Sequence, residues 1–181
     1  MNRILEAIKQ LLEATVANPS SPLYYDANDY KNGIRAVYFG DPLQIPMSSH
    51  PALVVHPIGT TYEKRGSRYD QKVHSVEIRL VDNAANYLAT TPADGLKVPS
   101  VERFGDMIEK SASDQETSSV SICGLIQNNP NLPYVNAESK EQETAAIDSR
   151  VRSVQYVFNS ARGYPTFEAI ILVEVIAQGD R

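Results

Sequence analysis

The segment "TFEAIILVEVIAQ", residues 166–178, is the feature that most limits what this chain can fold into. Apolar side chains fill both alternating sets of positions: Phe167, Ala169, Ile171, Val173 and Val175 on one side, and Ile170, Leu172 and Ile176 on the other. A strand with one face in water carries polar residues on that face, so this pattern predicts a strand buried on both faces. One face meets the helices. The other must meet a further layer of the same chain or a partner subunit.

Two β-hairpins are predicted. Residues 149–160 precede the last strand and join it through the turn-forming "ARGYP", which indicates a closing hairpin. A further hairpin around 54–81 has a returning strand, residues 71–81, in which two sets of side chains alternate with a period of two. The apolar face of that strand carries His74, Val76, Ile78 and Leu80, and the other face carries Val73, Ser75, Glu77 and Arg79. In its outgoing strand, Pro51 and Pro57 favour an edge position or a strand end.

Helical periodicity appears at the N-terminus. Residues 2–17 place Ile4, Leu5, Ile8, Leu11 and Leu12 on one helix face, and Pro19 and Pro22 prevent the helix from continuing. A second helix is predicted from residue 101, with Ser100 as its N-cap and Val101, Phe104, Met107 and Ile108 at helical spacing. For residues 120–126, helix and strand both stay open.

The remaining segments complete an α+β prediction. Residues 23–35 have no clear period and indicate a loop, residues 36–39 suit a short strand, and Gly40, Asp41 and Pro42 favour a turn. We therefore expect one domain over residues 1–181: a mostly antiparallel sheet with helices packed on one face, two β-hairpins and an N-terminal amphipathic helix. The hairpin around 54–81 projects from it.

Composition narrows the functional classes. The 181 residues are 42% hydrophobic, enough to bury a core, and the net charge of −5 argues against a general nucleic-acid binder. No stretch approaches the roughly 20 apolar residues of a membrane span. Charged residues interrupt the N-terminal apolar positions, which is unlike a signal peptide. We expect a protein of a cytoplasm-like compartment, with no membrane partner.

Candidate catalytic groups do not combine into an active site. His50, His56 and His74 lack a spacing typical of a metal site, and Cys123 has no identifiable base and is interpreted as a buried apolar residue. Glycine-rich phosphate loops and the nucleophile elbow are missing from the sequence. We predict a protein that is not an enzyme and uses no cofactor and no metal.

A metal-dependent nuclease is a remote alternative. Asp41 with Glu77 and Arg79 is similar to the acidic residues and E-x-K motif of such enzymes. Arginine stands in the lysine position, however, and it cannot deprotonate to act as a base. The turn at Asp41 and Pro42 also explains that aspartate without catalysis.

The tip of the hairpin around 54–81 is basic although the chain is acidic. Lys64, Arg65, Arg68 and Lys72 are interleaved with Tyr62 and Tyr69. The simplest interpretation is a solvated loop kept soluble by its charge. The functional interpretation is a contact for a subunit or a tube, because residues 102–116 hold five acids and two bases and residues 138–148 hold four acids and one base. Patches of opposite sign on one subunit suit head-to-tail contacts, in which charge sets register and encounter rate.

The order of these pieces resembles the tail terminator (tail completion) proteins of tailed bacteriophages and the related neck and minor tail proteins. The residues that carry the resemblance are "YFGDPLQIP" at 38–46, "PALVVHP" at 51–57 and "RGSRYDQKVHSVEIRLV" at 65–81, after the N-terminal helix. It covers about residues 1–82 and, more loosely, the closing hairpin, whereas residues 83–148 carry no part of the resemblance. These motifs are structural, with no catalytic residues to transfer.

The resemblance implies a structural virion protein, assembled in the host cytoplasm and located in the tail or neck. Such a subunit forms a ring, commonly of six copies, that caps the tail tube and joins it to the neck of the head. Its partners are copies of itself, the tail tube protein and a neck or head-completion protein, and DNA only passes through the lumen. A head-completion adaptor or a tube-like subunit of the same build is the alternative.

Overall fold

The computed structural model describes residues 1–21, 23–25, 33–40, 45–65, 69–83, 101–109, 121–159 and 165–178. Three α-helices lie in these segments: α1 (Asn2–Val16), α2 (Val101–Glu109) and α3 (Ile122–Asn128), with a short 3-10 helix η1 (Met47–Ser49). The strands are β1 (Ala36–Phe39), β2 (Ala52–Arg65), β3 (Tyr69–Asn83), β4 (Pro133–Val135), β5 (Gln142–Thr144), β6 (Asp148–Asn159) and β7 (Thr166–Gln178).

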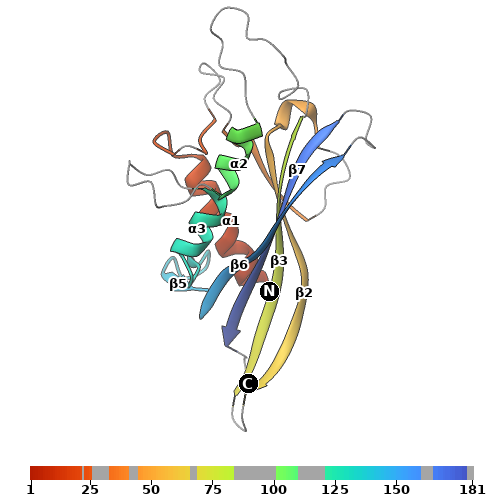
Figure 1. Cartoon of the computed structure of the whole chain (residues 1–181). Helices are drawn as coiled ribbons and strands as arrows, with labels where there is room; N and C mark the ends of the chain where they lie inside the picture. Colours follow the sequence, from red (N-terminus) through yellow and green to blue (C-terminus); the bar gives the residue numbers. More distant parts are fainter. Residues whose placement is uncertain are drawn as a thin grey trace, which may run out of the picture.

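Five strands form the main sheet in the order β1-β2-β3-β7-β6 (Figure 1). β1 runs parallel to β2, and the other neighbours are antiparallel. β4 and β5 form a separate two-stranded sheet. The predicted α+β class, with a mostly antiparallel sheet and two long hairpins, is confirmed.

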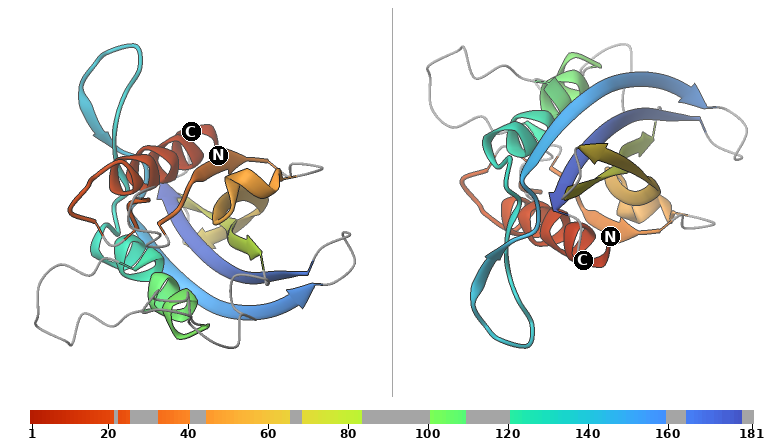
Figure 2. Two further views of the ribbon diagram at one scale, coloured as in Figure 1. Left: turned by 90° about the horizontal axis from the view of Figure 1, so that it is seen from above. Right: turned by 90° about the horizontal axis from the view of Figure 1, so that it is seen from below.

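The inner face of the sheet packs against α1, α2 and α3, which lie together on one side of it (Figure 2). The predicted apolar face of β3 is confirmed, since His74, Val76, Ile78 and Leu80 are buried while the alternate residues are partly exposed. β7 contributes Ala169, Ile171, Val173 and Val175 to the same core. Burying these apolar side chains, together with those of β3, contributes to the stability of the sheet.

The outer face of the sheet differs from the sequence prediction. Near β1, it holds a small second cluster in which Ile45 packs on Ala52, Val54 and Val81. On β7, however, Ile170, Leu172 and Ile176 are only partly buried, so the strand is fully covered on one face and incompletely covered on the other. Within the described chain, no second complete layer covers this side.

The helices follow the apolar periodicity of the sequence, whereas α1 begins after Met1 with no side-chain cap bond and the predicted cap Ser100 lies outside the described residues. α1 and α2 form where predicted, and Phe104, Met107 and Ile108 of α2 are buried. The segment whose structure the sequence left open is the helix α3. Its N-cap is Ser121, whose hydroxyl accepts a hydrogen bond from the N–H of Gly124 at 3.0 Å. This bond satisfies one of the free donors of the first turn, which favours helix over strand.

β2 and β3 extend beyond the rest of the sheet as an arm (Figure 1). The pairing of β3 with β7 ends at Gln71 and Gln178, whereas β2 and β3 stay paired as far as Arg65 and Tyr69. β1 covers β2 only from Ala52 to Val55, so Pro57 lies on an open edge where its missing N–H costs no ladder bond. The predicted edge position is confirmed, although the strand continues through Pro57 with a register shift.

Candidate functional site

The predicted contact residues lie on or near this arm. Tyr62 and Lys72 face each other directly across β2 and β3, and the Tyr62 side chain is 70% exposed. The last two residue pairs of the β2–β3 ladder are Lys64 with Asp70 and Arg65 with Tyr69. Their side chains, and the whole of Arg68, lie outside the described residues.

A hollow of about 850 Å³ opens at the root of the arm. The first residues of α1, including Arg3, form one wall, the arm residues Thr60, Tyr62, Lys72 and His74 form another, and residues 144–147 close it. Among the described residues that line it there are two basic side chains and no acidic one. Its lining is therefore basic in a chain of net charge −5. Hydrogen bonds from Tyr134 and Asn136 lower the pKa of Glu143, and the charge of Arg3 lowers it further, so Arg3 also faces this carboxylate of its own chain.

His74 fixes the floor of the hollow. Its side chain is 4% exposed, and its Nδ1 lies 2.8 Å from the Thr60 hydroxyl oxygen in the opposite strand. Burial lowers the pKa of His74, and the positive charges of the N-terminal amino group and Lys72 lower it further. The imidazole is therefore neutral at pH 7, and the positive charge of the hollow comes from its basic side chains.

The outer face of the sheet mixes apolar side chains with ion pairs. Glu174 on β7 forms ion pairs with two arginines of β6: its carboxylate lies 2.6 Å from Arg152 Nε and 3.3 Å from an Arg150 Nη. On β3, a guanidinium nitrogen of Arg79 lies 2.6 Å from a Glu77 oxygen, and another lies 4.0 Å from Glu168 on β7. The outer face of β7 and its neighbours therefore combines partly exposed apolar side chains with charged groups that are already paired.

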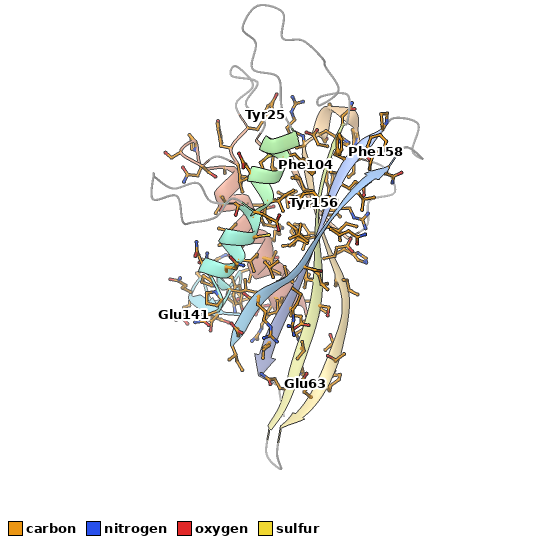
Figure 3. The ribbon with its side chains drawn as sticks, in the orientation of Figure 1. Tyr25, Glu63, Phe104, Glu141, Tyr156 and Phe158 are labelled. Carbon is orange, nitrogen blue, oxygen red and sulfur yellow. The ribbon has the colours of Figure 1, made fainter. Side chains whose placement is uncertain are left out.

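Among the strands that the structure describes, both side edges of the sheet lack a pairing neighbour along part of their length. β6 is one edge, and it carries exposed aromatic rings at Tyr156 (51%) and Phe158 (55%), which Figure 3 labels. The other edge is the part of β2 beyond Val55, where Ile58 and Tyr62 are exposed. Unpaired edges of this kind accept strands from another chain unless they are protected.

The groups considered for catalysis do not come together. Glu77 is held by Arg79, and Asp41 lies outside the described residues. In the described segments, no three His, Cys, Asp or Glu side chains gather as a metal site would require. His74 belongs to the hollow, whereas His50 is buried before β2 and His56 lies on β2.

Several residues of the hollow were missed from the sequence. Arg3, Thr60 and residues 144–147 are far apart along the chain, and only the packing of α1 against the arm side of the sheet unites them. Position 74, a histidine among apolar residues on a strand face, was the one signal that a polar site was near. The β4–β5 hairpin was also missed.

No protein-family model matches this chain, and no curated protein matches it. None of the helices in the described segments combines the length and the apolar character that crossing a membrane requires.

Proposed function

We propose that this chain is a structural virion protein of a tailed bacteriophage, a tail terminator or a close neck relative, which acts as a homo-oligomeric ring. The observation that carries the proposal is the incompletely covered outer face of β7. Ile170, Leu172 and Ile176 remain partly exposed on the outer face of a strand that is paired on both of its edges. Partly exposed apolar side chains in such a position, among charged groups that are already paired, support a contact with another protein.

The two open edges support a ring. β2 and β6 run in opposite directions, because each step from β2 through β3 and β7 to β6 is antiparallel. The edge of one copy can therefore continue as an antiparallel neighbour of the other edge of the next copy. Such a heterologous contact joins two different surfaces and closes into a ring when the rotation is right.

The arm extends this ring toward a partner. It projects past the sheet and carries the predicted contact residues Tyr62 and Lys72. The backbones of three further predicted contact residues, Lys64, Arg65 and Tyr69, also belong to it. We assign it to the tail tube or to the adjacent subunit. The net charge of −5 suits a conduit for DNA, because a ring that does not bind phosphate lets DNA pass through its lumen.

Electron microscopy of the purified protein, with and without tail tube protein, tests this proposal. Closed rings that bind to the ends of tubes are the expected result. Open filaments of this protein alone would favour the tube-like alternative, and rings that bind only neck components would favour a head-completion adaptor. Single particles with no assembly in either sample would contradict all three.

A further inference from the structure

The β4–β5 hairpin is a small element held unusually firmly. Its strands have only three residues each, and a hairpin of that size is marginal on its own. α1 supports it, because the Gln10 side chain donates to the Val135 carbonyl at 3.0 Å and accepts from the Val135 N–H at 2.8 Å. Leu132 and Tyr134 beside these bonds are buried in the main core.

Glu143 fixes the hairpin from within. Its carboxylate accepts hydrogen bonds from the Tyr134 hydroxyl at 2.8 Å and from the Asn136 amide at 2.6 Å. The hydroxyl of Ser139 lies 3.5 Å from the same carboxylate. The turn is thus ordered before it meets any partner, and a preorganised element loses little entropy on binding.

The tip of this hairpin is acidic and exposed. Residues 136–143 hold three glutamates and one lysine, and Glu138 and Glu141 are exposed. The hairpin stands out from the body beside α1 (Figure 2), and Glu141 lies on a different projection from Glu63 of the arm (Figure 3). The tip therefore points to space that another molecule can fill.

We propose that the acidic β4–β5 tip of one copy docks into the basic hollow at the root of the arm of the next copy. This inference rests on the proposed ring, for which it names one subunit contact. The tip brings Glu138 and Glu141, and the hollow brings Arg3 and Lys72, so the two surfaces have opposite charge. The hollow also has room for side chains, since about 850 Å³ is within the range of ordinary ligand sites.

The geometry favours docking of the tip into the hollow of a second copy over docking into the hollow of its own chain. Gln10 holds the hairpin about two helical turns along α1 from Arg3, which lies at the hollow. Thr144 leads out of the hairpin and lines the hollow, so the tip is at the opposite end of the β4–β5 ladder from its own hollow. The contact therefore joins the tip of one copy to the hollow of another, which is a head-to-tail arrangement.

A charge-swap experiment tests the contact. R3E/K72E reverses the charge of the hollow, E138K/E141K reverses the charge of the tip, and a fourfold variant combines the two pairs of substitutions. Sedimentation measures the dissociation constant of the assembly for each variant. We expect each double reversal to raise this constant about tenfold or more, and the fourfold variant to return it to within about threefold of the original. E13K, on an exposed face of α1, is the matched control and should leave it unchanged.

A cysteine pair gives a second test that does not depend on affinity. N2C places a thiol at the hollow and E138C places one at the tip, while Cys123 stays buried. Oxidation of N2C/E138C should give a ladder of covalently joined copies on a denaturing gel.

Two outcomes would overturn the contact while leaving the proposed ring intact. In the first, the protein forms a ring, but the charge reversals leave its dissociation constant unchanged, or their effects on it only add up in the fourfold variant. In the second, the cysteine pair forms a disulfide only within one chain. If the unmodified protein forms no assembly at all, the proposed ring fails, and this contact fails with it.

Discussion

Cys123 shows what burial does to a single group. The thiol lies on α3 inside the core, and burial, with the negative charge of Glu109, raises its pKa to about 12. Because the thiolate is the reactive form, the folded protein should react with a thiol reagent at about pH 8 at least a thousandfold more slowly than the unfolded chain does. Labelling with and without urea measures this ratio, and similar rates in the two states would contradict the buried position.

His50 and His74 make stability depend on pH. Burial is the largest cause that lowers the pKa of each below 6.5. The unfolded chain then binds protons more readily than the folded chain does, so stability is complete above about pH 6.5 and falls as the pH decreases below it. We expect the Tm followed by circular dichroism to decrease between about pH 7.5 and pH 5. H74Q should show a smaller decrease, and a Tm that rises toward acid would disprove this account.

At the scale of elements, the sequence predicted those in which apolar residues recur at a regular spacing over many positions. β3 alternates over a whole strand, and α1 and α2 show apolar faces, so all three were predicted. α3 could not be separated from a strand, because seven residues are too few and the Ser121 cap decides. β4 and β5 have three residues each, too short for any period, and depend on contacts with Gln10 and with the core.

Ile171 and Leu172 are neighbours on opposite faces of β7, so substitutions at these two positions separate the effect of the core from that of the open face. Ile171 is fully buried, so I171A should lower the free energy of unfolding by about 3 kcal/mol. Leu172 is partly exposed on the open face, so L172S should cost about 1 kcal/mol or less in the monomer but should weaken assembly. Urea unfolding and sedimentation of both variants measure the two effects. An L172S protein that assembles normally would show that this face is not a contact.

The arm carries its own prediction. R65E/R68E reverses two of the basic residues near its tip, beyond the part of the sheet that β7 supports. We expect weaker assembly or weaker binding to the tail tube, since reversed charge repels an acidic partner. The Tm should change little, because the pairing of β3 with β7 ends at Gln71, before these positions. Unchanged assembly and tube binding would remove the contact role of the arm and leave the fold untouched.

At the scale of the whole molecule, the described residues cover the main sheet well on one face and poorly on the other. The sequence showed that β7 is apolar on both faces, but not which partner covers the second one. It also did not reveal the basic hollow, because that site joins residues from α1, the arm and the segment after β5. Charge and apolar patches of this kind become visible only when distant segments are placed together.

Whether this chain assembles is decided by the mass of the purified protein in solution, measured by sedimentation across micromolar concentrations with and without tail tube protein. We expect one discrete species of several copies, six if the resemblance to tail terminators holds, which dissociates on dilution or with substitution of Leu172. A protein that stays a monomer at every concentration, alone and with the tube protein, would contradict it.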